Sequence, residues 1–244
     1  MTRLDQAMVE RGLCQSRERA KRSILAGQVR VNGQVAQKAS DSVAVGDEIV
    51  VAAPEKYVSR GGQKLEHALK HFQLDVTGLL TIDLGASTGG FTDCLLQSGA
   101  AKVFAVDVGQ GQFAWKLRQD PRVVVMEKTN ARHLTPAHFP ALFDLAVIDC
   151  SFISLRQILP PAAGLLKPDG KIVALIKPQF EAGKAEADKG RGVISDPAIH
   201  ERVLRELRDF ISAQAGLCWR DVVESPLLGP AGNKEFLTLI EKNG

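Results

Sequence analysis

The sequence predicts an α/β protein with a doubly wound, largely parallel sheet of about seven strands, preceded by a small α+β domain. Five short apolar runs alternate with helix-like segments over residues 80–176, the order expected for a parallel sheet covered by helices. A glycine-rich turn follows the first of these runs, as in many ligand-binding α/β folds. The first fifty residues differ, because two short helical patterns there precede alternating apolar positions.

Composition sets limits on the class of protein. The 244 residues suffice for one large domain or for a small and a medium one. The net charge is only +3, but residues 1–38 hold eight Lys or Arg against three acids. No run approaches the ~18 apolar residues of a membrane span and the N-terminus lacks an apolar signal segment, so we expect a cytoplasmic protein. The four cysteines form no CxxC pattern, so no metal site is predicted.

Residues 1–52 are expected to form the small domain. Residues 4–9 have the apolar spacing of a helix, and Ser16 stands where an N-cap would start a second helix over residues 17–26. Asn32-Gly33 lies between alternating apolar positions, which is a strong hairpin signal. The residues expected to face inward from the second helix are Ala20, Ile24 and Leu25.

Two short helices followed by Gly-Gln-Val-Arg-Val-Asn-Gly at 27–33 resemble the S-four-type RNA-binding domain of ribosomal proteins and pseudouridine synthases. The resemblance implies that basic side chains of the second helix and the hairpin lie against an RNA backbone, where Lys and Arg bind phosphates. A solvated basic helix is the alternative. The residues expected to bind RNA are Arg3, Arg17, Lys21, Arg22, Arg30 and, after the linker, Arg60.

A linker is expected at residues 53–59, because Ala-Ala-Pro-Glu breaks both patterns, and the second domain at residues 60–244. An amphipathic helix follows, with Lys64 near its start, where a cation opposes the helix dipole. A solvated or salt-bridged lysine is the simple interpretation; we favour a lysine of a functional site.

The sheet is expected to continue to the end of the chain. The terminal strands, 217–224 and 235–240, have no helical pattern between them and should be antiparallel. Pro160-Pro161 should divide the helix before the fifth strand into pieces at 153–157 and 162–166. Residues 181–192 lack periodicity and form either a disordered loop or a lid. The five expected parallel strands cover residues 80–83, 102–108, 123–126, 144–149 and 171–176.

The glycine-rich turn distinguishes between cofactors. A dinucleotide fingerprint needs glycine where this chain has Ser87. The turn instead resembles the first motif of S-adenosylmethionine-dependent methyltransferases, which implies a seven-stranded Rossmann-like methyltransferase domain with that cofactor. Asp107 lies 22 positions beyond Gly85, near the ~20 expected for an acid that binds a ribose. By this resemblance the cofactor-binding residues are Asp83, Gly85, Ser87, Gly89, Asp107 and Asn130.

Four motifs together resemble the TlyA family, also called haemolysin A, over the whole chain. The resemblance implies methylation of cytidine 2′-hydroxyls in ribosomal RNA, with ribosomal RNA or ribosomal subunits as partners. No membrane contact and no obligate protein partner are evident. The motifs lie at residues 59–65, 83–93, 149–155 and 177–181.

The FtsJ-like relatives of this family use a Lys–Asp–Lys–Glu set, which by motif becomes Lys64, Asp149, Lys177 and Glu235. Two lysines and two carboxylates suit ribose methylation, since the hydroxyl must be aligned with an electrophilic methyl group while its proton is taken or screened. Lys177 is the expected base or oxyanion-orienting group, with Asp149 as its partner. Glu235 competes with Glu224 and Glu241, which lie near the same strands.

Three other functions are weighed. Base N-methyltransferases carry Asp/Asn-Pro-Pro-Tyr/Phe after the fourth strand, whereas this chain has Asp-Cys-Ser-Phe at 149–152, without the prolines. A non-catalytic RNA-binding or ribosome-assembly protein would not need an intact cofactor motif and all four charged positions. A pore-forming haemolysin would need a membrane-active segment, which the sequence does not show.

Overall fold

The computed structural model describes residues 1–52 and 55–243, apart from the side chains of 184, 185 and 189. The chain divides into two compact units, Met1–Lys56 and Tyr57–Gly244. Residues 53 and 54 of the predicted linker lie outside the described residues. The end of that linker packs within the second unit, since Tyr57 is only 4% exposed and Val58 N–H donates to Asp93.

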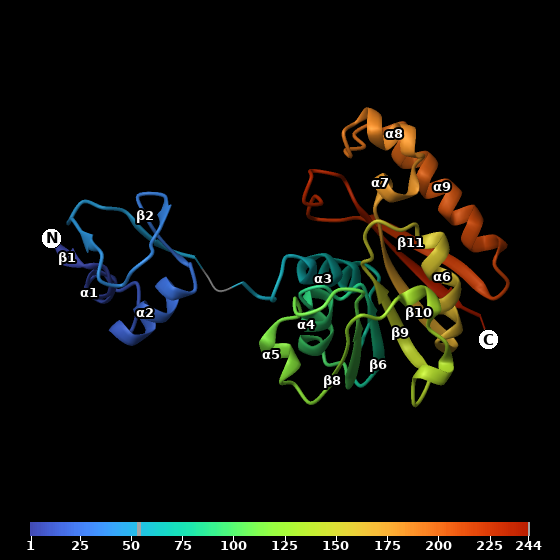
Figure 1. Cartoon of the computed structure of the whole chain (residues 1–244), viewed down its shortest axis with the longest axis horizontal. Helices are drawn as coiled ribbons and strands as arrows, with labels where there is room; N and C mark the ends of the chain where they lie inside the picture. Colours follow the sequence, from blue (N-terminus) through green and yellow to red (C-terminus); the bar gives the residue numbers. More distant parts are fainter. Residues whose placement is uncertain (53–54, 244) are drawn as a thin grey trace. The chain divides into compact units, whose positions relative to one another are not determined.

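The first unit combines two short helices, α1 and α2 (Figure 1), with two small antiparallel sheets, of strand order β3-β2-β5 and β1-β4. As predicted, Ser16 caps the second helix by accepting a hydrogen bond from Arg19 N–H. Asn32 and Gly33 both have positive φ, as a tight hairpin turn requires. The elements are β1 (Thr2–Arg3), α1 (Leu4–Glu10), α2 (Arg17–Leu25), β2 (Val29–Val31), β3 (Gln34–Val35), β4 (Ser42–Val43) and β5 (Ile49–Val51).

The prediction that Leu25 faces inward is wrong, because its side chain is 82% exposed. Ala20 and Ile24 are buried as expected, and they are four residues apart on one face of α2. Leu25 is one residue further along, so it is turned about 100° away from that face. The small core of this unit is complete without it.

The second unit is the predicted seven-stranded sheet, in the order β11-β12-β10-β9-β6-β7-β8. β12 is antiparallel to both of its neighbours, as expected for the terminal pair, and the four pairings from β10 to β8 are parallel. The strands are β6 (Leu80–Leu84), β7 (Lys102–Val106), β8 (Val123–Met126), β9 (Phe143–Ile148), β10 (Leu166–Ile176), β11 (Leu217–Glu224) and β12 (Phe236–Lys242).

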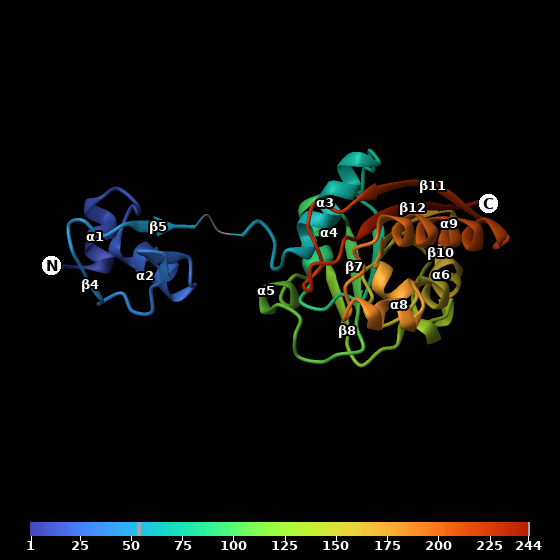
Figure 2. The same cartoon turned by 90° about the horizontal axis from the view of Figure 1, so that it is seen from above.

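Helices cover both faces of this sheet, as Figures 1 and 2 show. Successive strand residues therefore enter opposite cores: Ile172 and Ala174 contact the core with α6 and α9, and Val173 contacts the core with α3 and α4. The helices are α3 (Gly61–His71), α4 (Gly90–Gln97), α5 (Trp115–Arg118), α6 (Leu155–Gly164), α7 (Pro178–Glu181), α8 (Lys184–Lys189) and α9 (Pro197–Ala213), with short 3₁₀ helices η1 (Ala131–His133) and η2 (Pro136–His138).

The two prolines do not divide the helix before β10, contrary to the prediction. α6 continues through Pro160 and Pro161, although each lacks the N–H of a helical hydrogen bond. Its other face buries Ile158 and Leu159 against the sheet. The free energy of that burial outweighs the lost hydrogen bonds, so packing determines the helix here.

The parallel strands deliver the predicted site residues to one edge. Asp107, Asp149 and Lys177 each directly follow the last residue of a parallel strand, β7, β9 and β10 respectively. The carboxyl ends of parallel strands meet at one edge of a sheet, so these three side chains lie beside the turn after β6. None of the helices in the described residues is long and apolar enough to cross a membrane.

We predict that Phe143→Ala lowers the free energy of unfolding of the second unit by about 3–5 kcal/mol. Phe143 is fully buried and its ring contacts Phe104 and Phe139 edge-on, at centroid distances of 5.3 and 5.0 Å. Both tryptophans, Trp115 and Trp219, lie in this unit, so urea denaturation followed by tryptophan fluorescence reports on it alone.

Phe152→Ala is the matched control, because that ring is 90% exposed and should change the free energy by less than about 0.5 kcal/mol. Equal denaturation midpoints for the two variants would contradict the assigned core.

Candidate active site

The glycine-rich turn between β6 and α4 depends on its glycines. Gly85 has a φ of +88°, and a Cβ there would lie 2.8 Å from the backbone oxygen of Asp149. The Gly85 and Ala86 N–H groups both donate to the carbonyl oxygen of Val106. The turn is therefore held tightly against the ends of β7 and β9.

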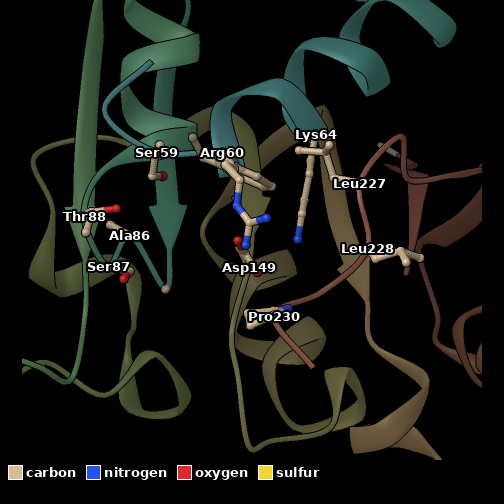
Figure 3. A pocket seen from close by; sticks show the side chains of 14 residues that line it. Ser59, Arg60, Lys64, Ala86, Ser87, Thr88, Asp149, Leu227, Leu228 and Pro230 are labelled. Atoms are coloured by element: carbon tan, nitrogen blue, oxygen red, sulfur yellow. The ribbon is translucent and has the colours of Figure 1, made fainter. Parts of the chain in front are cut away.

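Two adjoining cavities open beside this turn, and Gly85, Ser87 and Asp149 line both. The smaller, of about 210 Å³, is bounded by the start of α3 and by the loop between β11 and β12. The larger, of about 410 Å³, is bounded by the ends of β7 and β9. Figure 3 shows the smaller cavity, with Arg60 and Lys64 pointing into it from the same segment.

Lys177 and Asp149 form the first charged pair of the site. Lys177 Nζ lies 2.6 Å from Asp149 Oδ1 and donates to Ser151 Oγ at 2.8 Å. The lysine side chain is 10% exposed and the aspartate side chain 23%. Because an unpaired charge in such a place is strongly destabilising, each group depends on the other.

Lys64 and Glu235 form the second pair. Glu235 is 1% exposed and accepts a hydrogen bond from the Lys64 ammonium. Its carboxylate packs against Gly229, where a Cβ would lie 2.5 Å from Oε1. The competing acids lie elsewhere: Glu224 pairs with Lys234, and Glu241 with Lys171 and Arg220. The structure thus brings all four predicted catalytic residues together as two lysine–carboxylate pairs.

The predicted cofactor residues separate into two layers. Ser87, Asp107 and Asn130 line the larger cavity together with Gly85. The Asp107 carboxylate accepts hydrogen bonds from the N–H groups of Ser87 and Gly109, each at 2.7 Å. The Asn130 side-chain oxygen caps η1 by accepting from Arg132 N–H.

Asp83 and Gly89 form the second layer, behind the cavity linings. Asp83 is fully buried and accepts a hydrogen bond from Thr92 Oγ1 at 2.7 Å, while its Oδ1 finds no hydrogen-bond partner among the described residues. Gly89 has a φ of +96° and faces the side chains of Phe113 and Leu117. Both residues contact the protein interior behind the turn and line neither cavity.

The charges around the turn fit the predicted cofactor. The carboxylates of Asp107 and Asp149 line the larger cavity. Negative charge there favours a cation such as the sulfonium of S-adenosylmethionine and opposes a pyrophosphate. The described residues contain no cluster of three or more His, Cys, Asp or Glu suited to a metal.

Several residues of the site were not predicted from the sequence. Ser151 belongs to the motif at 149–155, and it accepts a hydrogen bond from Lys177. Glu181 ends the motif Lys-Pro-Gln-Phe-Glu and accepts from Ser154 Oγ and Leu155 N–H, so it ties α7 to the start of α6. Phe152 has a φ of +62° and lines the larger cavity with an exposed ring.

The predicted RNA-binding residues differ in their surroundings. Arg60 lines the smaller cavity and points toward Asp149 in Figure 3. In the first unit, Arg30 donates to the Gly33 carbonyl oxygen, and Arg22 lies 3.6 Å from Glu18 in an exposed pair. Lys21 is exposed on α2. Arg3 and Arg17 both contact the buried Asp5.

We predict that Asp83→Asn changes how stability depends on pH. Burial raises the pKa of Asp83 to about 7, although the hydrogen bond from Thr92 lowers it. A raised pKa means that the folded state binds the proton more tightly than the unfolded chain, whose aspartates titrate near ~3.9. The stabilisation that protonated Asp83 gives the folded state is therefore fully present below about pH 4, and it is lost as the pH rises through about 7.

The wild-type free energy of unfolding, measured relative to Asp83→Asn by urea denaturation, should fall steadily between about pH 4 and pH 7. A difference that stays constant over this range would show that Asp83 titrates normally.

Comparisons with known proteins identify the family of each domain. The family of FtsJ-like methyltransferases matches residues 57–242, and the S4 domain, the S-four-type RNA-binding domain, matches residues 2–49. The 16S/23S rRNA (cytidine-2′-O)-methyltransferase TlyA of Mycobacterium tuberculosis is 48% identical over 96% of this chain and 87% of its own length.

Two further relatives cover most of both chains. YqxC of Bacillus subtilis, described as a candidate rRNA methyltransferase, is 50% identical over 96% of this chain and 84% of its own length. The solved structure of a candidate haemolysin from Streptococcus thermophilus is 45% identical, with a TM-score of 0.76 over 99% of this chain and 88% of that one. The predicted TlyA resemblance, fold class, methyltransferase activity and S-adenosylmethionine cofactor are confirmed, and the chain belongs to the FtsJ-like methyltransferases.

Proposed function

We propose that this protein transfers the methyl group of S-adenosylmethionine to a ribose 2′-hydroxyl of ribosomal RNA, at a cytidine. The observation that carries the proposal is the pairing of two nearly buried lysines with two carboxylates beside the cofactor turn. The printed activity of the M. tuberculosis relative supports the same reaction. The S4 domain supports an RNA substrate.

The chemistry assigns a role to Lys177. The bound cofactor supplies an electrophilic methyl group, while a ribose hydroxyl is a weak nucleophile until its proton is removed or screened. Lys177 Nζ is the group that contacts the attacking oxygen: as a cation it stabilises negative charge there, and in its neutral form it takes the proton. Asp149 and Ser151 fix the position of that nitrogen through the contacts at 2.6 and 2.8 Å.

Lys64 lines the smaller cavity and is held there by Glu235. The ion pair joins α3 to the residue just before β12, so it fixes two walls formed by distant parts of the sequence. Lys64 adds positive charge where the reacting oxygen would gain negative charge. Holding the oxygen in line with the methyl group is the larger share of the catalysis, worth roughly 7–11 kcal/mol in well-oriented reactions.

Phe152 supports a nucleic acid as the substrate. A bulky residue at positive φ is strained, and such residues cluster at functional sites. The exposed ring of Phe152 lies at the larger cavity, beside Phe180. A nucleotide turned out of its stack needs such a surface for its base. We assign the ring to contact with a base of the RNA.

Base N-methylation is the competing reaction. Its motif would place two prolines at the positions of Cys150 and Ser151, and here Ser151 instead accepts from Lys177. The missing prolines and this hydrogen bond favour the ribose. Ribosomal subunits as partners and a cytoplasmic location belong to the same proposal.

We predict that Lys177→Ala lowers the rate of methyl transfer to ribosomal RNA by at least about 10²-fold, because the group at the attacking oxygen is lost. Binding of RNA should change by less than about threefold. Transfer of labelled methyl groups to purified ribosomal subunits measures the rate, and equilibrium binding is measured separately.

Lys171→Ala is the matched control, since Lys171 lies on the same strand but pairs with Glu241 away from the cavities. It should keep wild-type activity. The wild-type product should resist alkaline hydrolysis at the modified nucleotide, because a 2′-O-methyl group blocks cleavage of the adjacent phosphodiester. A labelled product that alkali cleaves there, or an active Lys177→Ala enzyme, would contradict the proposal.

A further inference from the structure

The first unit contains a buried acid that the proposed reaction does not use. Asp5, in the first turn of α1, is fully buried. Arg3 donates to both of its oxygens, from Nε at 3.0 Å and from Nη2 at 3.3 Å. Arg17 donates to Oδ2, from Nη2 at 2.9 Å and from Nε at 3.3 Å. One carboxylate therefore holds two guanidinium groups from different elements.

The carboxylate is charged at any physiological pH. The hydrogen bond from Arg3, with that from Arg17, lowers the pKa of Asp5 to about 2 despite its burial. The arginine side chains remain 46% and 53% exposed, so their outer edges face solvent. Each guanidinium has five N–H donors, and the hydrogen bonds to Asp5 involve only the Nε and Nη2 groups.

We infer that Asp5 is a positioning residue for RNA: it holds Arg3 and Arg17 as an oriented pair that binds the phosphate backbone. The inference rests on the RNA-binding part of the proposed function. Arginine binds phosphate through its planar fork of donors, and a fork already fixed loses less rotamer entropy on binding than a free side chain. The fixed pair thus gives stronger and better oriented phosphate contacts than two mobile cations.

A purely structural role for Asp5 predicts the opposite effect on binding. If the carboxylate only joined α1 to α2, its replacement by an amide would remove a negative charge next to a basic surface. RNA binding by the folded protein would then stay equal or become tighter, because phosphate attraction depends on net positive charge. If Asp5 orients the arginines, binding becomes weaker although the net charge rises. The sign of the change separates the two roles.

The test uses the full chain with purified 16S and 23S rRNA, well below the melting temperature of each variant. Asp5→Asn should raise the Kd for rRNA about tenfold. Glu18→Gln is the matched control, since it also removes one negative charge, from an exposed acid on α2. That control should bind equally or more tightly. Equal or tighter binding by Asp5→Asn, or no binding of either rRNA by the wild type, would overturn the inference.

A mutant cycle gives a second readout that does not depend on stability. If Asp5 acts through the two arginines, Asp5→Asn should change the Kd by less than about twofold once Arg3→Ala and Arg17→Ala are both present. The same loss in both backgrounds would contradict positioning. If Asp5→Asn fails to fold, Arg17→Lys replaces it as the test. This variant keeps the positive charge but loses the planar fork of donors, and it should weaken RNA binding several-fold. Arg19→Lys is its control, because Arg19 contacts Gln15 and not Asp5, and it should leave RNA binding unchanged.

These outcomes are independent of the reaction. A protein that binds rRNA with this pattern but yields a methylated base, or no methylated product, would contradict the proposed function and leave the role of Asp5 intact.

Discussion

The ion pair between Lys177 and Asp149 is the interaction on which the site depends. Two charges placed at the ends of buried strands must compensate each other, since either one alone would be strongly unfavourable. The parallel register of β9 and β10 sets their separation, because each residue directly follows its strand. The register of β6 with β9 places the Asp149 backbone against Gly85, so the turn and the charged pair form one rigid arrangement. Loss of either strand end would disturb the cofactor cavity and the attacking group together.

Much of this arrangement could be predicted from the sequence. The apolar runs located the strands, and acids or lysines at their ends had to meet at one edge of a parallel sheet. Motif resemblance supplied Lys64 and Glu235, which lie 171 positions apart and which no local pattern relates. Ser151 and Glu181 escaped prediction, because a hydrogen bond between segments depends on side-chain geometry and leaves no periodic signal. Pro160 was misjudged because packing of α6 against the sheet outweighed the local preference of proline. Leu25 was misjudged because it lies about 100° around α2 from Ile24, outside the buried face.

Buried acids have different roles in the two units. Asp83, beneath the cofactor turn, has little compensation and a raised pKa, so its charge is coupled to pH and to the neighbouring carboxylates. Asp5 is compensated by two arginines and stays ionised. The first arrangement makes stability depend on pH, whereas the second converts two flexible cations into an oriented pair.

The central claim is that the two lysine–carboxylate pairs direct the methyl group to a ribose oxygen. The most direct measurement maps the methylated cytidine, replaces that one residue by its 2′-deoxy analogue in a reconstituted rRNA, and follows methyl transfer by the wild-type enzyme. The account predicts that transfer is lost while the modified rRNA still binds and competes with the unmodified substrate. Undiminished transfer to the 2′-deoxy residue would show that a base atom is the acceptor.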